Sequence, residues 1–326
     1  MWILGIDVSK DELAVRLQNE IGEFKEGTFT NSTKGFNQLR KWIKPVKLAA
    51  LHACMEATNV YWEEVALYLH EHGAAVSVVN PMRIKGYAQS QMQRNKTDQL
   101  DARVIADFCA ATPDLKQHLW VPPTPEQSKL RALVRHRDAL IKARTQHTNR
   151  LKTCREDAVK QSLQAVIATL NEQIDQMTKQ IRELIDQDPT LKQDRDLLLT
   201  IVGIGERSAE HILAELQNLA NYDSARAAAA DVGLTPSHHE SGSTVRRRPR
   251  LSKIGKSSLR GALYLPALSA LQHNPLIRDF ASRLEQRGKA RMVIVGAVMR
   301  KLVHIAYGVL KHRTPFDPQH RQIAHA

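Results

Sequence analysis

Four carboxylates in the first third of the chain have the residue types and spacing that a two-metal nuclease requires. Asp7 and Glu56 each end an apolar run that is typical of a buried strand. Asp98 and Asp101 stand three apart at the start of a helical pattern, so they share one helix face. A carboxylate at the end of a buried strand is costly without a partner. The set therefore predicts a shared divalent cation that serves phosphoryl transfer.

Each of these carboxylates also has an ordinary structural explanation. A helix dipole alone favours Asp98, Asp101 could pair with Arg103, and Glu56 could cap the helix that follows it. Asp7 is the hardest to explain in this way, because it closes an apolar strand and precedes a turn. As a set, the four favour a metal site over coincidence.

The second reactive candidate is a hydroxyl in a basic segment. Ser241 follows His238 and His239 and precedes Gly242, which permits close approach of a substrate backbone. A serine hydroxyl becomes a nucleophile only beside a base, a metal or cations. Position alone favours an ordinary turn serine, so both alternatives stay open. A phosphate-binding patch follows, made of Arg246, Arg247, Arg248 and Arg250.

Positive charge is concentrated in the last quarter of the chain. Residues 241–326 contain 17 Lys and Arg against 3 Asp and Glu, whereas residues 1–240 contain 30 against 31. This asymmetry predicts a polyanion at the basic region. Lys253 and Lys256 continue the basic track, and we expect them to contact nucleic-acid backbone.

A Gly-Ile-Gly sequence joins two apolar helical segments further upstream. Gly203 and Gly205 would let a phosphate approach the amino terminus of the following helix, as in a helix-hairpin-helix. The alternative is a plain helical turn.

Composition narrows the class of protein. A chain of 326 residues with 42% hydrophobic residues can fold into two domains with packed cores. Cys54, Cys109 and Cys154 lack the spacing of zinc ligands or a disulfide framework, so a reducing cytoplasm is expected. No signal peptide is expected, because the amino terminus lacks a basic segment. No membrane-spanning segment is expected either, since the longest candidate, residues 292–310, contains charged residues.

The hydrophobic pattern predicts an α/β domain of ribonuclease-H (RuvC-like) type at residues 1–120. In that fold the first and fourth strands are neighbours, which would bring Asp7 and Glu56 together. Asn31 is the expected cap of the first helix. The expected elements are strands 3–8, 13–17, 24–30 and 48–56, a helix after Asn31 with Phe36, Leu39 and Ile43 on one face, a helix 61–72 and a strand 75–79.

A proline-rich linker at 122–125 leads to a helical coiled-coil arm at residues 121–190. Apolar residues within 163–184 recur at spacings close to a heptad seam. The seam fits either an antiparallel hairpin that packs on itself or a dimerisation arm. Residues 191–326 are predicted to form a mainly α domain with helices at 224–232, 257–271 and 290–311 and a polar loop at 233–250.

Over essentially its whole length the chain resembles the insertion-sequence transposases with a RuvC-like DEDD domain followed by a transposase domain. These are the bridge-RNA-guided recombinases, related to the pilin-gene DNA invertases. The motifs that carry the resemblance are Gly5-Ile6-Asp7-Val8-Ser9-Lys10, Met55-Glu56-Ala57-Thr58, Asn80-Pro81, Arg94-Asn95-Lys96-Thr97-Asp98-Gln99-Leu100-Asp101-Ala102-Arg103, Gly203-Ile204-Gly205, Gly233-Leu234-Thr235-Pro236, Glu240-Ser241-Gly242-Ser243 and Ser252-Lys253-Ile254-Gly255-Lys256.

The resemblance implies roles that composition does not show. The four carboxylates would be the DEDD ligands of Mg²⁺ or Mn²⁺, and Ser241 would be the nucleophile that attaches covalently to DNA. A structured non-coding guide RNA would pair with double-stranded target and donor DNA. The serine domain of one protomer would join the acidic domain of another, so a homo-oligomer, dimer or tetramer, is expected in the bacterial cytoplasm at the nucleoid. One departure is Asn59, where members often carry glycine.

The sequence thus predicts an RNA-guided DNA recombinase that cuts and rejoins strands through a phosphoserine intermediate. Covalent linkage conserves phosphodiester energy, which agrees with the lack of an ATP-binding P-loop sequence. One alternative is a metal-dependent RuvC-like nuclease that hydrolyses branched DNA by water attack. The other is a catalytically decayed nucleic-acid-binding protein.

Overall fold

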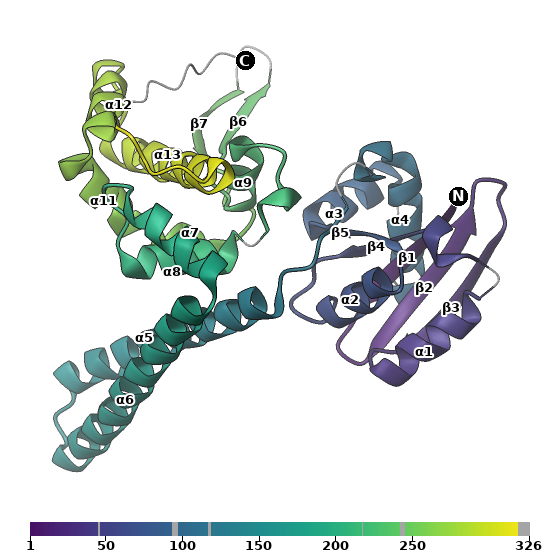
Figure 1. The fold of residues 1–326 in the computed structure, drawn as a ribbon, viewed down its shortest axis with the longest axis horizontal. Helices are drawn as coiled ribbons and strands as arrows, with labels where there is room; N and C mark the ends of the chain where they lie inside the picture. The colour runs from purple at the N-terminus through teal and green to yellow at the C-terminus, as the bar shows by residue number, and fades with distance from the viewer. Residues whose placement is uncertain (45, 93–96, 117–118, 217, 242–244, 319–326) are drawn as a thin grey trace. The chain divides into compact units, whose positions relative to one another are not determined.

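The computed structural model describes residues 1–318 except 45, 93–96, 117–118, 217 and 242–244, and of residues 220, 238–241 and 245–249 it describes the backbone alone. The chain divides into two units, Met1–Pro122 and Pro123–Ala326 (Figure 1). The predicted arm belongs to the second unit, together with the residues that follow it.

A five-stranded sheet forms the centre of the first unit. Its strands are β1 (Trp2–Val8), β2 (Glu12–Asn19), β3 (Phe24–Thr30), β4 (Leu51–Glu56) and β5 (Ala75–Val79). The order is β3-β2-β1-β4-β5, with β1 antiparallel to β2 and parallel to β4. The predicted strand order is therefore confirmed, including the neighbouring first and fourth strands.

Four helices pack on this sheet, and their amino-terminal caps differ in part from the prediction. They are α1 (Thr33–Trp42), α2 (Glu63–Glu71), α3 (Pro81–Ser90) and α4 (Asp98–Ala111). Ser32 caps α1, so the prediction that Asn31 does so is wrong; the Asn31 amide donates to the backbone oxygens of Ser9 and Tyr61. The sequence reading missed α3. Asn80-Pro81 ends β5 and also starts this helix, because the Asn80 side chain accepts from the amide of Met82.

Helix α4 crosses β1 at Gly5 with almost no space between the two backbones. A Cβ at Gly5 would lie 2.3 Å from the carbonyl oxygen of Ala102 and 2.5 Å from the amide nitrogen of Ala106. Only glycine permits this approach, which sets the height of α4 above the sheet.

We expect Gly5→Ala to lower the free energy of unfolding by about 3 kcal/mol, because α4 must move away from the sheet. Gly86→Ala in α3 is the matched control, since a Cβ there meets no atom within 4 Å. It should be neutral or stabilising by about 0.5–1 kcal/mol. Urea unfolding of both variants measures the difference, and equal stabilities would show that α4 can shift without cost.

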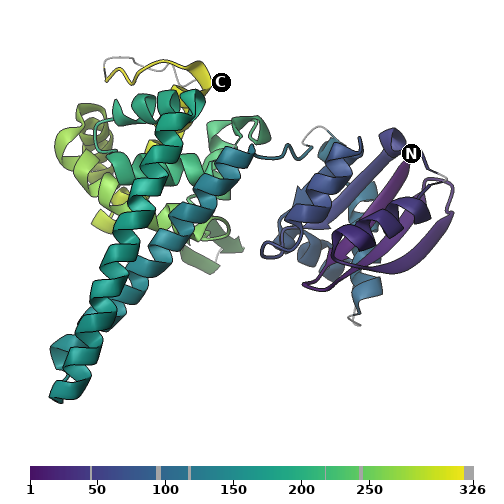
Figure 2. The ribbon, with the colours of Figure 1, turned by 60° about the horizontal axis from the view of Figure 1, so that its bottom comes forward.

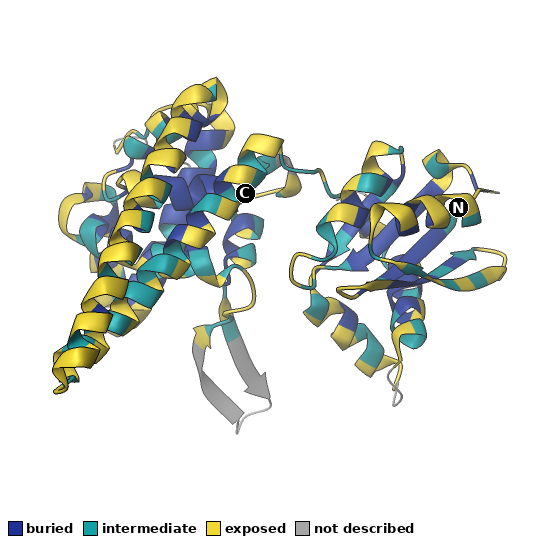
Figure 3. Cartoon of the chain, turned by 90° about the horizontal axis from the view of Figure 1, so that it is seen from below, coloured by how far each residue is buried: buried dark blue, intermediate teal, exposed yellow. Residues whose placement is uncertain are grey.

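Two long antiparallel helices begin the second unit. Helices α5 (Pro125–Thr153) and α6 (Asp157–Gln187) lie side by side (Figure 2). The seam residues Leu163, Ile174 and Ile181 are buried within this hairpin, while its outer faces are exposed (Figure 3). Val166 of the same seam is exposed, so the choice between a self-packing hairpin and a dimerisation arm stays a prediction.

Two ion pairs, one of them fully buried, connect the base of this hairpin to the rest of the unit. Arg137 is fully buried and pairs with buried Glu210, and Arg135 donates two hydrogen bonds to Glu215 at 2.8 and 2.9 Å. Arg137, Glu210 and Glu215 are buried, and buried charges are tolerated only when paired. These pairs fix α5 against the helix that carries Glu210 and Glu215.

The remaining elements enclose the largest core of the protein. They are α7 (Pro189–Leu199), α8 (Glu206–Glu215), α9 (Ala225–Asp231), β6 (Pro236–Ser241), β7 (Val245–Leu251), α10 (Ser257–Ala262), α11 (Tyr264–His273), α12 (Pro275–Gln286) and α13 (Arg291–His312). The predicted polar loop is in fact the two-stranded hairpin β6–β7, with Pro236 opposite Leu251. The predicted helix 257–271 is two helices, and α12, which Asn274 caps, was missed.

Helix α13 corrects the expectation that no segment reaches membrane-spanning length. Residues Arg291–His312 are long and apolar enough by length and composition. However, 67% of the apolar window is buried inside the unit. Its apolar character is accounted for by its place in the core, where Leu302, Val303 and Ala306 are buried.

Candidate functional site

Two of the predicted carboxylates lie at the same end of adjacent parallel strands. Ile6 is the register partner of Met55, and the residues that follow them are Asp7, the last but one residue of β1, and Glu56, the last residue of β4. Both are half-buried. Glu56 accepts a hydrogen bond of 2.6 Å from the hydroxyl of Thr58, and it does not cap α2.

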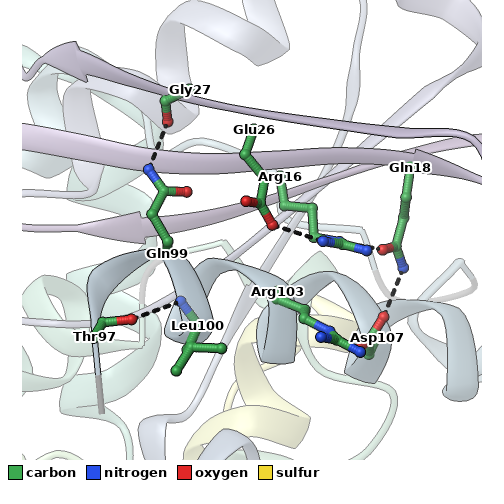
Figure 4. A network of polar contacts seen from close by, with 9 residues as sticks. All are labelled: Arg16, Gln18, Glu26, Gly27, Thr97, Gln99, Leu100, Arg103 and Asp107. Carbon is green, nitrogen blue, oxygen red and sulfur yellow. Dashed lines mark hydrogen bonds and ion pairs between the residues drawn. The ribbon is translucent and has the colours of Figure 1, made fainter. Parts of the chain in front are cut away.

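Helix α4 positions the other two carboxylates. Thr97 caps the helix by accepting from the amide of Leu100 at 3.3 Å, and Asp98 and Asp101 lie in the first turn. Polar contacts attach α4 to the sheet: the Gln99 amide donates to the backbone oxygen of Gly27 at 3.4 Å (Figure 4) and to the Thr28 hydroxyl at 2.9 Å. Further along the helix, Gln18 donates to Asp107 at 3.0 Å, and Arg103 pairs with Asp107 at 3.5 Å. The start of α4 is therefore held against β3, and its later part against β2.

A cleft of about 230 Å³ lies between the end of β1 and the start of α4. Asp7 and Asp98 both line it, whereas Glu56 and Asp101 do not. Among the described residues, no three acidic, cysteine or histidine side chains come within reach of one ion. The structure therefore brings two of the four predicted ligands together. The other lining residues are Ser9, Glu12, Ala14, Thr28, Thr97 and Gln99.

Glu12 is a carboxylate of this cleft that the sequence reading missed. It begins β2 directly after the turn from Asp7, and the Ser9 hydroxyl accepts from its amide at 3.1 Å. The sequence could have indicated this position, because Asp7 and Glu12 are separated by only a tight turn. Such a turn returns the chain to the same edge of the sheet.

The lining of this cleft fits a hard divalent cation. Its donors are carboxylate, hydroxyl and amide oxygens, with no sulfur or imidazole among the described lining residues. Mg²⁺ retains several waters and binds through one or two carboxylates and substrate phosphates. Asp7 and Asp98 are therefore as many carboxylate ligands as a protein normally contributes to Mg²⁺.

Ser241 is the last residue of β6, opposite Val245 across the hairpin turn. The side chains of residues 238–241 and 245–249 lie outside the described part of the structure, as do residues 242–244 entirely. The hydroxyl of Ser241 and the guanidinium groups of Arg246, Arg247 and Arg248 are therefore not placed, and the same holds for Arg94, Asn95 and Lys96 of the upstream motif. Arg250 is described and exposed.

Lys256 has an internal role that the sequence reading did not foresee. Its ammonium donates to the backbone oxygen of Glu215 at 2.6 Å and the hydroxyl of Tyr222 at 2.8 Å, and it pairs with Asp231 at 2.7 Å. An ammonium has three donors, and these contacts use all of them. Lys256 is thus not available as the predicted nucleic-acid contact. Lys253, in contrast, is exposed.

The segment around Lys256 holds the base of the β6–β7 hairpin against α9. Gly255 has φ +126°, and a Cβ there would lie 1.9 Å from the carbonyl oxygen of Asp231. The Lys256 amide donates to the same oxygen at 2.7 Å. Burial and the neighbouring Asp231 raise the pKa of Tyr222, so its hydroxyl stays protonated and donates to Asp231 at 2.6 Å. We call residues 255–256 with their partners Tyr222 and Asp231 the hairpin latch.

We expect Lys256→Met to lower the free energy of unfolding by about 2 kcal/mol, because the Asp231 carboxylate and the backbone oxygen of Glu215 lose their donor. Lys253→Met removes the same charge from an exposed position and should change stability by about 0.5 kcal/mol or less. Thermal unfolding distinguishes the two. Equal effects would show that the latch contributes nothing to the fold.

Gly203 and Gly205 differ in their surroundings. Gly203 has φ +107°, and a Cβ there would lie 2.7 Å from the Cβ of Ala270 in α11, so helix packing alone requires glycine. Gly205 is the residue before α8 and has open space around its Cα. The open position of Gly205 is compatible with an approaching phosphate, and the helix-hairpin-helix remains a prediction.

The strand order and the acidic cleft define the first unit as an α/β domain of ribonuclease-H type with carboxylates at the expected edge. Residues 4–159 match the DEDD transposase model of IS110, and residues 195–282 match the model of the IS116/IS110/IS902 transposase family. The chain belongs to this transposase family. It is a DNA recombinase that cleaves and transfers DNA strands.

Several relatives align along most of the chain. The pilin gene-inverting protein of Moraxella bovis is 34% identical over 325 residues, which cover 96% of this chain and 97% of that protein. The transposase for insertion sequence element IS1328 of Yersinia enterocolitica is 26% identical over 97% of this chain and 98% of its own. The solved structure of Thermus thermophilus RuvC covers 34% of this chain and 95% of its own, with 13% identity and a TM-score of 0.27.

Proposed function

We propose that this transposase is an RNA-guided recombinase of an insertion sequence that cuts and rejoins DNA through a covalent bond to Ser241. The observation that carries the proposal is the convergence of Asp7 and Asp98 on one oxygen-lined cleft in a chain of this family. Ser241 supports it by its place at the end of β6, beside the turn of a hairpin whose base is latched to α9.

The acidic cleft would hold Mg²⁺ or Mn²⁺ through Asp7 and Asp98, with Glu56 and Asp101 as further ligands when substrate is present. Bound Mg²⁺ supplies charge neutralisation at the scissile phosphate and at the leaving oxygen. The Ser241 oxygen forms a bond to phosphorus and loses its proton to solvent, while the bond from phosphorus to a 3′ or 5′ oxygen of the DNA breaks. That oxygen takes up a proton from solvent and leaves as a hydroxyl. Arg246, Arg247, Arg248, Arg250 and Lys253 bind the phosphate backbone, and Gly205 admits a phosphate at the α8 terminus of a helix-hairpin-helix.

The proposed partners are double-stranded target and donor DNA, a structured non-coding guide RNA and a second copy of the chain in a dimer or tetramer at the nucleoid. The Moraxella bovis relative inverts a pilin gene, as its name states. Base pairing with the RNA would choose the sites, so few base-reading side chains are needed.

RNA guidance is tested with RNA transcribed from the DNA that flanks the coding region. Changing the loop that pairs with the target should move recombination to the matching new target in a purified reaction. Recombination at the old target, or at equal rate without RNA, would remove guidance from the proposal while leaving the recombinase intact.

Water attack by a RuvC-like nuclease on branched DNA is the second candidate function, favoured by an acidic cleft made entirely of first-unit residues.

A nucleic-acid-binding protein with a decayed active site is the third candidate. The departure at Asn59 does not support decay, because this residue has φ +53° and asparagine tolerates that left-handed backbone nearly as glycine does. Ser241 separates the first candidate from the second.

A further inference from the structure

Cationic side chains from three helices gather in the second unit, away from the β6–β7 hairpin in sequence. Arg300 and Lys301 lie one helical turn before His304 on α13, so they share its face. Helix α13 packs against both α9 and α12, which contribute Arg226 and Arg283. We call Arg226, Arg283, Arg300 and Lys301 the α13 cationic cluster.

These cations lack the counter-charges that other cations of the unit have. In the part of the chain that the structure describes, none of the four forms an ion pair, and the Arg283 side chain donates only to the backbone oxygen of Asp279. By comparison, Arg195 contacts two aspartates, and Arg135 pairs with buried Glu215. Like charges that face one another destabilise the folded chain.

His304 reports the field that the cluster creates. Burial and the charges of Arg300, Lys301 and Arg226 lower the pKa of His304 to about 4. Burial and Arg283 also lower the pKa of Lys301. The Nε2 atom of His304 is buried and has no hydrogen-bond partner among the described residues. Arg300 and Lys301 are half-buried beside this unsatisfied nitrogen, and Arg226 and Arg283 are exposed. A group of cations without counter-charges is the environment that an anion would complete.

We propose that the α13 cationic cluster is a binding site for backbone phosphates of duplex DNA. Arginine forks match phosphate oxygens in two hydrogen bonds, and Lys301 adds a point charge. The site deepens the proposed function, on which it rests for the identity of the polyanion. The α13 cationic cluster lies on helices α9, α12 and α13, whereas the arginines proposed above lie on strand β7. The cluster would therefore add a second set of phosphate contacts.

The test compares the salt dependence of duplex binding by the full chain and two triple variants. The cluster variant is Arg226→Gln, Arg283→Gln and Arg300→Gln. The control variant is Arg287→Gln, Lys289→Gln and Arg291→Gln, which removes the same charge from exposed positions at the α12–α13 turn. The probes are a labelled 30-base-pair duplex DNA and an RNA hairpin of the same length, followed by fluorescence anisotropy.

Each phosphate contact contributes about −0.9 to the slope of log affinity against log salt, so the cluster variant should flatten the slope by about two to three. DNA affinity at low salt should fall at least tenfold, and the control variant should change it less than threefold. Because repulsion is removed, the melting temperature of the free cluster variant should equal or exceed that of the wild type.

Three results would overturn the proposal: an unchanged slope, an equal loss in the control variant, or a loss confined to the RNA probe. A lower melting temperature with unchanged DNA affinity would assign the cluster to the fold instead. Binding does not need the Ser241 hydroxyl, so the slopes are read equally well in Ser241→Ala protein. Absence of covalent adducts in the wild type would count against the proposed function and leave this measurement valid.

Discussion

Ser241→Ala is expected to abolish covalent protein–DNA adducts and to reduce strand exchange by a factor on the order of 10⁴ or more. The physical reason is direct, since alanine has no oxygen to form the bond to phosphorus. The measurement uses a labelled duplex with a nick that traps the intermediate, resolved on a denaturing gel. Binding of the duplex should be unchanged.

Ser257→Ala is the matched control, because it removes a hydroxyl from an exposed position in the same unit. It should form adducts at the rate of the wild type. If Ser241→Ala protein cleaves DNA as fast as the wild type, the nucleophile is water, and the nuclease candidate replaces the recombinase.

Asp7→Asn is expected to slow cleavage and adduct formation by a factor on the order of 10³ while leaving DNA binding intact. Asn keeps the shape of Asp7 but removes the charge that a hard cation requires. Asp98→Asn should behave alike, because both residues line the same cleft. The control is Asp11→Asn, an exposed carboxylate in the turn after β1, which should retain activity.

A second readout of the same variants does not depend on catalysis. A cation that binds only the folded chain raises its melting temperature by mass action. Addition of Mg²⁺ should therefore stabilise the wild type and Asp11→Asn and have no effect on Asp7→Asn. Equal stabilisation of all three would place the cation elsewhere.

The arrangement of the first unit was largely predictable from the sequence. Apolar runs that end in Asp7 and Glu56 are strong signals, because buried parallel strands have no polar face. Their neighbouring positions then follow from the strand order. The cleft was predicted only in part, since the approach of Asp98 to Asp7 depends on how closely α4 crosses Gly5, and that distance is a tertiary property.

The second unit was less predictable, because side-chain direction and the pairing of polar strands leave little trace in the sequence. The net charge of a segment gives the number of basic residues but not the direction of each side chain. Lys256 was therefore predicted to contact nucleic acid, although its ammonium contacts Glu215, Tyr222 and Asp231. The hairpin β6–β7 was read as a loop because polar strands lack the apolar alternation that identifies half-buried strands. Backbone pairing, such as Pro236 with Leu251, leaves no sequence signal of that kind.

The measurement that tests the account most directly mixes two inactive proteins. Ser241→Ala keeps the acidic cleft, and Asp7→Asn, carrying a size tag, keeps the serine. If acids of one protomer and the serine of another act on the same phosphate, the mixture should regain covalent adducts, all of them on the tagged Asp7→Asn chain. Adducts formed by Asp7→Asn protein alone at the wild-type rate would contradict the account, because the serine would then work without the acidic cleft.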